Sequence, residues 1–566
     1  MMIEGSLTVI AVAVAFCWSR LGSTHFSRIE RAFARLAHRR GLAVAAVGVT
    51  ALLLRLALLP LCPIPKPFIH DDFSFLLAAD TFASGRLTNP TPAMWMHFES
   101  FHITMKPTYM SMYFPAQGIV LAAGKVLAGH PWYGVLSVTA MMCAAICWML
   151  QAWLPANWAL LGGMLAVLRL GLFSYWINTY AGGGSVAALG GALVLGAFPR
   201  FMRAARFRDS MLLATGLIIL ATSRPYEGLL LSLPVAAVLG RWLFVGKNRP
   251  PTTVLLRRTV PALALVLTAG LCMAHYNDRA FGSPLIQPYK INRATYAVAP
   301  YWVWQSPRPE PTYRYKVFRD FYVDGELPYV TKLHTLSGFF SETLFKPLTL
   351  VQFFVGIALL PPLIMLPRVV IDRRTRFLVI CGLVYTAGML VEIFLFPHYL
   401  APFIAAFYAL GLQAMRHLRL WRPGGQPVGV GLVRLTVTLC IALAAMRAYA
   451  EPLHLKLAVW PTLTWYGARD FGTARAQVEA GLEQVPGRQL VIVRYSPKHD
   501  PLDEWVYNAA DIDSSKVIWA REMDPANDLT LINYYNDRKV WLVQPDIRPA
   551  EVSPYKMSGQ ESPALR

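Results

Sequence analysis

Long apolar runs separated by short polar stretches make up most of the chain. Runs of roughly 20 apolar residues can cross the roughly 30 Å hydrocarbon core of a membrane as α-helices. The runs predict spans at about residues 5–18, 41–62, 112–128, 132–153, 157–175, 183–198, 209–223, 227–245, 258–276, 347–366, 377–396, 399–415 and 428–446. The pattern therefore predicts an α-helical polytopic membrane protein with about 11 to 13 spans.

Three larger polar regions interrupt this pattern, at residues 63–111, 277–346 and 450–566. Arginines and lysines instead gather in short runs between the spans, as they do in cytoplasmic loops. These basic runs lie at residues 28–40, 200–208, 247–258, 368–376 and 416–422. Counting crossings from the basic runs near each end places all three polar regions on the extracytoplasmic side. The two counts disagree by one crossing, so we expect one short segment between residues 112 and 198 to be re-entrant or to cross only partly.

The C-terminal polar region has the pattern of a small folded domain. Segments rich in valine and isoleucine predict strands at residues 488–495, 515–520 and 538–546. The segment 524–537 predicts a helix with Asp524 as its N-cap and Pro525 as its first residue. Because strands alternate with a helix, we expect a small α/β unit.

These patterns divide the chain into three expected parts. Residues 1–40 form a first span and a basic cytoplasmic segment. Residues 41–446 form a membrane domain with outer loops at 63–111 and 277–346, and residues 450–566 form an extracytoplasmic α/β domain. Residues 7–18 lack the basic start and the cleavage site of a signal peptide, so we interpret them as part of the first span.

Composition excludes a soluble protein and a nucleic-acid-binding protein. The 566 residues are 55% hydrophobic and 15% charged, with a mean hydropathy of +0.42, whereas a soluble domain carries roughly 25% charge. The net charge of +21 is divided among loops between apolar spans, so no continuous basic face for nucleic acid is predicted. All 7 cysteines lie in or at the edge of apolar segments, which encodes neither a disulfide framework nor a zinc motif.

An acidic pair follows the span at residues 41–62. Asp71 and Asp72 fall in the first turn of a predicted amphipathic helix whose apolar positions are Phe73, Leu76, Leu77 and Phe82. Carboxylates in the first turn of a helix are stabilised by its dipole, so the pair could serve only as a cap. A carboxylate pair at the membrane surface could also supply a general base, with mutual repulsion raising one pKa.

Further polar groups follow in the same loop. The segment WMHFESFH at residues 95–102 places His97, Glu99 and His102 close together, as a possible metal set or as ordinary loop residues. Their spacing matches no zinc motif. Lys106 could bind a phosphate at the membrane interface or act as a generic basic anchor.

Three tight turns between spans also carry candidate residues. The turn at 223–228 holds Arg224 and Glu227, which could pair with each other or bind an anionic ligand. The turn at 396–403 carries His398 and Tyr399. A third turn, SYWINTYAGGG, is rich in aromatic residues and glycine, and its aromatics are expected to form part of the interfacial belt.

Taken in order, these motifs resemble those of the GT-C superfamily of polytopic glycosyltransferases. The likeness is greatest to family 39-like bacterial members, which include protein O-mannosyltransferases and aminoarabinose transferases. The segment HDDFSFLLAADTFASGRL resembles the acidic pair of the first outer loop, with Asp72 where glutamate is usual. YFPAQG resembles a Tyr-Pro-Pro segment, with Tyr113 in the tyrosine place and Phe114 replacing the first proline. The segments 209–234 and 398–411 resemble later turns, and the likeness covers residues 41–446.

The resemblance implies a transferase that moves a hexose or pentose from a polyprenyl-phosphate donor to an envelope acceptor. The reaction would occur at the outer face of the cytoplasmic membrane, with inversion and with Asp71 or Asp72 as general base. The implied substrate-binding residues are Lys106, Tyr113, Arg224, Glu227, His398 and Tyr399. A divalent metal occurs in some members only, so a metal cofactor is possible but not implied. The expected partners are the lipid-linked donor and membrane lipids, and the oligomeric state is open.

Other functions fit the same pattern. A lipid-linked oligosaccharide ligase also uses a lipid donor outside the membrane. A lipid or polysaccharide transporter, or a non-enzymatic assembly protein, are further alternatives. A transporter would be favoured by charged residues along a path through the spans. Few ionisable residues lie deep in the predicted spans, the exceptions being Arg55, Lys125, Arg169 and Glu392.

Overall fold

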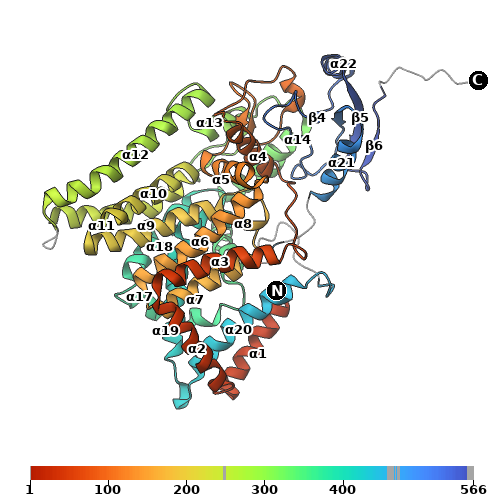
Figure 1. Cartoon of the computed structure of the whole chain (residues 1–566). Helices are drawn as coiled ribbons and strands as arrows, with labels where there is room; N and C mark the ends of the chain where they lie inside the picture. Colours follow the sequence, from red (N-terminus) through yellow and green to blue (C-terminus); the bar gives the residue numbers. More distant parts are fainter. Residues whose placement is uncertain (1, 246–249, 456–463, 466, 468–471, 557–566) are drawn as a thin grey trace, which may run out of the picture.

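A large helical body carries a small sheet domain at one end, beside α4 (Figure 1). The computed structural model describes residues 2–245, 250–455, 464–465, 467 and 472–556. These parts confirm the predicted fold class, a multi-pass helical membrane protein with a small C-terminal α/β domain.

The elements follow the predicted order along the chain. The N-terminal segment contains α1 (Met2–Cys17), α2 (Ser23–His38) and α3 (Arg40–Ala57), and the first polar region contains α4 (His70–Ala83), η1 (Trp95–Phe98), β1 (Ile103–Thr104) and β2 (Met110–Ser111). The first half of the body contains α5 (Pro115–Ala128), α6 (Trp132–Trp153), α7 (Ala156–Ala166), η2 (Val167–Gly171), α8 (Tyr175–Asn178), α9 (Gly184–Ala204), α10 (Phe207–Ser223), α11 (Pro225–Val245) and α12 (Thr252–Phe281).

The second polar region and the second half of the body follow. The polar region contains α13 (Pro288–Tyr296), α14 (Lys316–Arg319), η3 (Asp320–Gly325) and α15 (Glu326–Leu333). The second half contains α16 (Leu336–Leu350), η4 (Val351–Val355), η5 (Pro361–Met365), α17 (Leu366–Ile371), α18 (Arg376–Val391), η6 (Pro397–Phe403), α19 (Ile404–Arg419), η7 (Pro423–Gly425) and α20 (Val428–Ala448).

Six helices among the described residues are long and apolar enough to cross a membrane, namely α3, α6, α9, α11, α12 and α20. A seventh crossing results if η5–α17 and α18, which are bent by 106° at their break, form one span. The other predicted spans correspond to shorter helices. For example, α5 has 14 residues, which extend only about 21 Å at 1.5 Å per residue.

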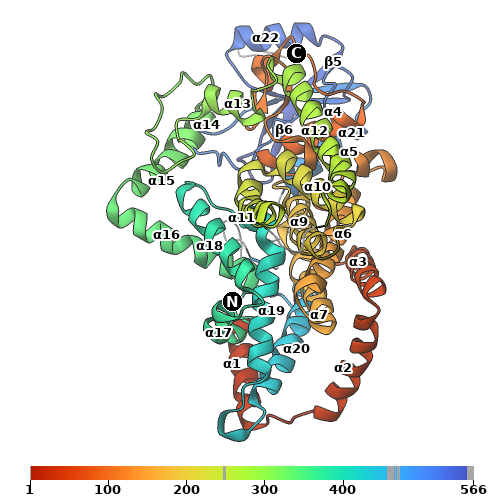
Figure 2. The same cartoon turned by 90° about the vertical axis from the view of Figure 1, so that its left-hand side faces the viewer.

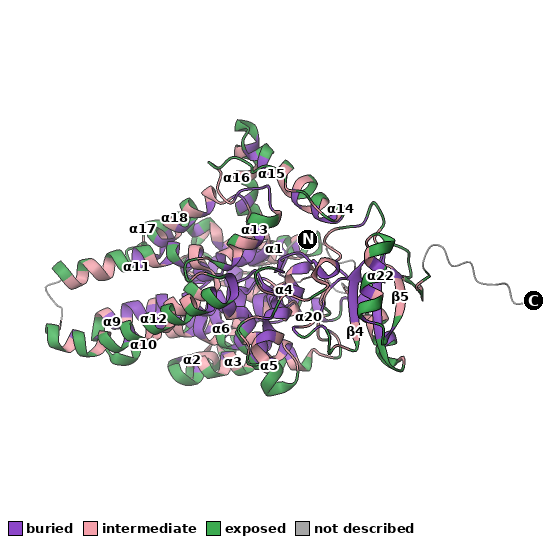
Figure 3. Ribbon diagram, turned by 90° about the horizontal axis from the view of Figure 1, so that it is seen from above, coloured by how far each residue is buried: buried purple, intermediate pink, exposed green. Residues whose placement is uncertain are grey.

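The centre of the body is formed by α6 and α9, whereas α12 lies at its edge. Of the most apolar 18 residues of each helix, 67% are buried in α6 and 83% in α9, but only 11% in α12. Figure 3 shows the buried residues gathered around α6 and exposed residues along α12. Leu263, Leu267 and Leu271 of α12 are 59%, 68% and 72% exposed. Such an apolar face is suited to contact lipid.

Contacts between α3 and α6 show that these two helices run in opposite directions. Gln151, near the end of α6, donates to the carbonyl of Arg40 at the start of α3 over 3.0 Å. At the other end, the guanidinium of Arg55 lies 4.7 Å from the ring centre of Trp132, the first residue of α6. The body therefore has two ends, which we call the basic end (Arg40) and the acidic-pair end (Arg55).

The short helix α5 begins and ends at the acidic-pair end. Its start follows Tyr113, which contacts Asp71, and its last residue, Ala128, lies four positions before the start of α6. The sequence predicts a span at residues 112–128, but the helix α5 formed there does not cross the body. This explains why the two counts of crossings, made from the two ends of the chain, differ by one. With α5 not crossing, the three polar regions fall at one end of the body.

The basic runs meet at the opposite end. Arg203 donates to the carbonyl of Ala152 over 2.9 Å, and the rings of Trp153 and Phe377 stack 5.8 Å apart. Glu30 of the amphipathic helix α2 forms ion pairs of 2.9 Å with Arg419 and with Arg434. Figure 2 shows α2 along the lower edge of the body, away from α13 and α22.

The tail forms a four-stranded sheet with the order β4-β3-β5-β6. Its strands and helices are α21 (Thr473–Gln484), β3 (Arg488–Val493), β4 (Val517–Arg521), α22 (Pro525–Tyr534), β5 (Arg538–Gln544) and β6 (Glu551–Pro554). The central strand β3 is parallel to β4 and β5, and β6 is antiparallel to β5. The carboxylate of Asp524 accepts hydrogen bonds from the N–H groups of Ala526 and Asn527, each 3.1 Å long, so it is the predicted N-cap of α22.

The tail packs directly on the first polar region. Arg521 at the end of β4 is buried, donates to the carbonyl of Glu99 over 2.6 Å, and pairs with Glu504. The ring of His97 meets the carbonyl of Arg521 at 3.1 Å, and Tyr109 donates to the carbonyl of Asn508 over 2.8 Å. The tail and residues 63–111 therefore lie on the same side of the body.

Candidate active site

The acidic pair occupies the first turn of α4, as the sequence predicts. The N-cap position is Ile69, whose backbone is extended and whose side chain accepts no hydrogen bond. The side chains of Asp71 and Asp72 point in different directions and have different partners. Neither carboxylate serves as the N-cap of α4.

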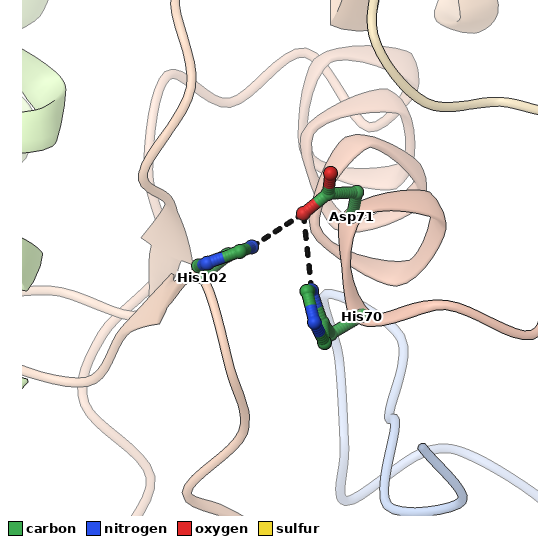
Figure 4. Close-up of side chains that lie close together, drawn as sticks. All are labelled: His70, Asp71 and His102. Atoms are coloured by element: carbon green, nitrogen blue, oxygen red, sulfur yellow. Dashed lines mark hydrogen bonds and ion pairs between the residues drawn. The ribbon is translucent and has the colours of Figure 1, made fainter. Parts of the chain in front are cut away.

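Asp71 lies at the centre of a small polar cluster (Figure 4). One of its carboxylate oxygens, Oδ1, lies 3.0 Å from Nδ1 of His70 and accepts a hydrogen bond of 2.6 Å from the hydroxyl of Tyr113. The same oxygen is hydrogen-bonded to Nδ1 of His102. His70 comes from α4, His102 from the turn before β1, and Tyr113 from the approach to α5. Three segments of the first polar region therefore meet at one carboxylate oxygen.

The cluster holds Asp71 in its ionised form. Burial raises the pKa of Asp71, but the neighbouring His102 and His70 outweigh this effect and hold the pKa well below its usual range. Burial and the charge of His70 lower the pKa of His102 to about 4. At neutral pH, Asp71 is therefore an anion and His102 a neutral imidazole, which can donate its Nδ1–H to the carboxylate.

Asp72 binds backbone groups on two neighbouring segments. Its Oδ1 accepts a hydrogen bond of 2.8 Å from the N–H of Tyr180, and its Oδ2 accepts one of 3.4 Å from the N–H of Phe68. The residue is only 1% exposed, and burial raises the pKa of its carboxyl to about 7. By contrast, the side chain of Asp71 is 28% exposed. Asp72 thus ties α4 to the turn at residues 174–184, while Asp71 is accessible.

That turn, expected only as an aromatic rim, connects the acidic pair to both of the other turns. The hydroxyl of Tyr175 lies 2.8 Å from Nδ1 of His398. Arg224 donates to the carbonyl of Gly182 over 3.0 Å. Gly182 has φ +80, and a Cβ there would lie 3.0 Å from Nδ1 of His398, so glycine is required for this close approach.

Asp71 and Arg224 each lie within electrostatic range of His398. Burial and the charge of Arg224 lower the pKa of His398 well below its usual range, and the charge of Asp71 opposes them. Arg224 also lies 4.7 Å from the ring centre of Tyr399 and pairs with Glu227 at 3.5 Å. The structure therefore brings together most of the substrate-binding residues named from the sequence.

The metal set named from the sequence does not come together. His97 lies in η1 and faces the tail, where it is 3.8 Å from a carboxylate oxygen of Asp528. Glu99 accepts a hydrogen bond of 2.8 Å from Tyr296 and pairs with Arg314. His97 thus contacts the tail, and Glu99 contacts the second polar region. Neither of these two described side chains is bonded to His102.

Among the described residues, the set with metal-ligand spacing is His70, Asp71 and His102. One ligand atom from each lies within 4.8 Å of the other two. Nitrogen and carboxylate ligands of this kind suit zinc and other divalent metals. His70 was not identified from the sequence, although its place directly before the acidic pair was visible there.

Lys106 also lies apart from the cluster. It is exposed, and its ammonium stacks on the ring of Trp95 at 4.4 Å from the ring centre. Arg314 lies against the same ring at 4.8 Å. Lys106 therefore behaves as a surface cation of the first polar region.

A second arginine, which no sequence motif indicates, lies near the cluster. Arg293 of α13 is buried and pairs with Glu326 at 2.9 Å. Its charge contributes to the low pKa of His102. Asp71 and His70 in turn influence the pKa of Glu326, which burial raises. An isolated arginine in a long polar loop belongs to no motif, so no sequence pattern indicates it.

No protein-family model and no curated protein sequence matches the chain. Among solved structures, it is similar to the apo oligosaccharyltransferase of Archaeoglobus fulgidus, with 11% identity, a TM-score of 0.43, and coverage of 80% of this chain and 62% of that chain. It is also similar to apo ArnT from Cupriavidus metallidurans, with 14% identity, a TM-score of 0.44, and coverage of 88% and 93%.

A third similar structure is AglB from A. fulgidus in complex with an inhibitory peptide and a dolichol-phosphate. The identity is 11%, the TM-score is 0.42, and the coverage is 88% of this chain and 69% of that chain. These proteins are GT-C superfamily glycosyltransferases, the group that the motifs resemble.

The cluster offers two kinds of chemistry. An accessible, ionised carboxylate held by a hydroxyl and two imidazoles can accept a proton from a nearby nucleophile. Alternatively, the carboxylate and the two Nδ1 atoms can hold a divalent cation. In either case the nearby guanidinium of Arg224 can bind an anionic group such as a phosphate.

Proposed function

We propose that this protein is a membrane glycosyltransferase that moves a sugar from a polyprenyl-phosphate donor to an envelope acceptor. The observation that carries the proposal is the accessible Asp71 carboxylate, ionised and oriented by His102 and Tyr113, with Asp71 and Arg224 each within electrostatic range of His398. A base and a phosphate-binding cation at one end of an apolar bundle are what transfer from a lipid phosphate requires.

Asp71 is the proposed general base. The hydroxyl or amine of the acceptor attacks the anomeric carbon of the sugar as Asp71 removes its proton. The bond between that carbon and the phosphate oxygen breaks on the opposite face, so the configuration inverts. Asp72 is excluded from this role because both of its oxygens accept backbone hydrogen bonds and its side chain is buried.

The leaving group is a polyprenyl phosphate, whose negative charge increases as the bond breaks. Arg224 is the proposed cation that stabilises it, since a guanidinium binds phosphate through two parallel hydrogen bonds. Arg293 supplies further positive potential from α13. Arg293, and not Lys106, is the second cation of the proposed donor site. The ammonium of Lys106 stacks on the ring of Trp95 instead.

The proposed location is the outer face of the cytoplasmic membrane. The basic runs at residues 200–208, 368–376 and 416–422 lie at the end opposite the acidic pair, and such runs favour the cytoplasmic side. The first polar region, the second polar region and the tail then face outward together. The tail, packed on residues 63–111, is proposed to cover the mouth of the site and to shape acceptor entry.

A divalent metal is an alternative use of the same cluster. His70, Asp71 and His102 would hold it, and the ion would supply positive charge for the donor phosphate. Chelation distinguishes the two mechanisms. If Asp71 acts as a base alone, dialysis of the purified protein against EDTA leaves the rate unchanged, whereas a required metal makes activity depend on added Zn²⁺ or Mn²⁺.

A transporter is less well supported. The buried Arg55 donates to the carbonyl of Cys62 over 2.8 Å, and Arg169 donates to the carbonyl of Val355 and lies 3.8 Å from Glu4. These two charges have local partners within the body. An oligosaccharide ligase differs only in the size of the donor sugar, so a comparison of monosaccharide and oligosaccharide donors separates it from the main proposal.

The test is complementation of a strain that lacks the gene, with envelope glycans followed by mass spectrometry. Asp71→Asn should abolish the modification while the protein accumulates normally in the membrane. Asp72→Asn should lower the amount of folded protein without abolishing transfer per molecule. Asp80→Asn is the matched control, because Asp80 lies on the same helix and pairs with Lys125 instead. Full complementation by Asp71→Asn would remove Asp71 from the mechanism.

A further inference from the structure

A cavity of about 420 Å³ lies at the basic end, between the start of α7, the connection from α17 to α18, and the end of α19. Its lining includes Arg374, Arg416 and Arg419, together with Asp372. Figure 1 shows α7, α17 and α19 in the part of the body remote from α4. This cavity is therefore separate from the proposed active site.

The charges around the cavity do not balance. Arg419 is neutralised by Glu30, with two hydrogen bonds of 3.1 and 2.9 Å. The carboxylate of Asp372 lies 3.3 Å from Nε2 of His417 and also accepts a hydrogen bond from a side-chain amide. The carboxylate of Asp372 is therefore already engaged by neighbouring side chains.

Two arginines are left facing the same cavity. Arg416 donates to the neutral amide oxygen of Gln413 over 2.6 Å. Neither Arg374 nor Arg416 forms an ion pair with a carboxylate among the described residues. Two guanidinium groups that share a cavity repel each other, and an anion between them would relieve that repulsion.

The rim of the cavity suits a lipid. Trp158 of α7 contributes to the lining, and tryptophan is enriched at the interface between membrane and water. Leu420, at the end of α19, also lines the cavity and is 75% exposed. An apolar side chain beside two arginines matches a ligand with a charged head and an acyl chain.

We propose that this cavity binds the phosphate of an anionic phospholipid headgroup through Arg374 and Arg416. Arginine forms forked hydrogen bonds to phosphate oxygens, and basic pockets between membrane helices on the cytoplasmic side bind anionic headgroups. The bound lipid joins the α17–α18 connection to α19 and so braces the 106° bend. The proposal is independent of the proposed transferase activity.

The experiment uses the full-length protein, purified in detergent and stripped of lipid. Thermal unfolding is followed during titration with dioctanoyl phosphatidylglycerol, dioctanoyl phosphatidylcholine or inorganic phosphate. Phosphatidylglycerol should raise the Tm and the other two ligands should not. In Arg374→Gln/Arg416→Gln the apparent Kd for phosphatidylglycerol should be weaker by about 30-fold, as expected for two lost surface charges.

Arg373→Gln is the matched control, because Arg373 is exposed on the same connection but does not line the cavity. It should bind phosphatidylglycerol as the unchanged protein does. Arg374→Gln alone, at an exposed position, provides a variant that will fold if the double variant does not. Equal binding in all variants would overturn the proposal. Equal protection by inorganic phosphate would also overturn it, because a phospholipid would then not be needed.

Discussion

Asp71 and Asp72 are adjacent residues in different surroundings. The carboxylate of Asp71 meets side chains that can change partners during a reaction, and it is partly open to solvent. The carboxylate of Asp72 accepts hydrogen bonds from the backbone N–H groups of Phe68 and Tyr180 and is buried. Asp72 thus fixes the position of α4, and the carboxylate of Asp71 remains accessible to a substrate.

At this scale we expect Tyr113 to orient the proposed base. Tyr113→Phe removes the hydroxyl that donates to Asp71 over 2.6 Å. A hydrogen bond to a charged group contributes about 1.5–3 kcal/mol, so kcat should fall by about 10-fold or more, with little change in donor KM. Steady-state kinetics with the purified protein provide the measurement.

Tyr276→Phe is the control for this experiment. The Tyr276 hydroxyl is buried and has no hydrogen-bond partner in the described part of the chain. Its removal should leave kcat unchanged. A rate for Tyr113→Phe equal to that of the control would mean that Asp71 does not need this hydroxyl.

Arg224 is expected to act on the donor phosphate. Arg224→Gln should raise the donor KM by about 10-fold to 100-fold, which corresponds to the loss of one charged hydrogen bond. Arg224→Lys should recover part of the affinity, because it keeps the charge and loses the forked geometry. Arg241→Gln, at an exposed position on the same helix α11, is the control. An unchanged KM in Arg224→Gln would remove this residue from the donor site.

At the scale of elements, the tail is attached to the first polar region by a buried ion pair. Arg521 of β4 pairs with Glu504 and also donates to the backbone of Glu99. Both side chains of the pair are at most 2% exposed. Strand β4 therefore holds the segment that carries His102 in place through contacts that do not involve the Asp71 carboxylate.

Breaking this pair should loosen the tail. Arg521→Met leaves the Glu504 carboxylate buried without its cation, which typically costs about 3–5 kcal/mol. We expect a lower Tm and faster cleavage of the tail in limited proteolysis. The double variant Arg521→Met/Glu504→Gln removes the stranded charge and should recover much of the stability. If the double variant is no more stable than the single one, the pair is not what holds the tail.

At the scale of the whole molecule, polar regions separated by hundreds of residues form one surface. Phe101 of the first region stacks on Phe318 of the second at 4.5 Å. Arg521 of the tail lies 5.2 Å from the ring centre of the same Phe318. The basic runs lie at the other end, where Glu30 binds Arg419 and Arg434. This polarity supports a single orientation in the membrane.

The orientation can be measured by labelling single cysteines in spheroplasts with a membrane-impermeant maleimide. Asp324→Cys in the second polar region and Asn536→Cys in the tail are exposed positions and should react. Arg422→Cys, exposed at the basic end, should react only after the membrane is permeabilised. The unchanged protein reports the background from its own cysteines. Labelling of Arg422→Cys in intact spheroplasts would reverse the proposed topology.

The sequence by itself determined the features that depend on local pattern. Apolar runs predicted the helices of the body, and runs of valine and isoleucine predicted β3, β4 and β5. Asp524 was identified as an N-cap and is one. The acidic pair was located in the first turn of α4. These features follow from residues close in the chain, because helix and strand periodicity and capping act over a few positions.

Only the tertiary structure decided which residues meet. His102 reaches Asp71 across 31 positions, His398 reaches Tyr175 across 223, and Arg521 reaches Glu99 across 422. No local pattern encodes such pairings, so nothing in the sequence indicated His70 or Arg293, and the possible metal set of His97, Glu99 and His102 is divided among different partners. The same holds for α5, since an apolar segment specifies a helix but its length and packing decide whether it crosses the membrane.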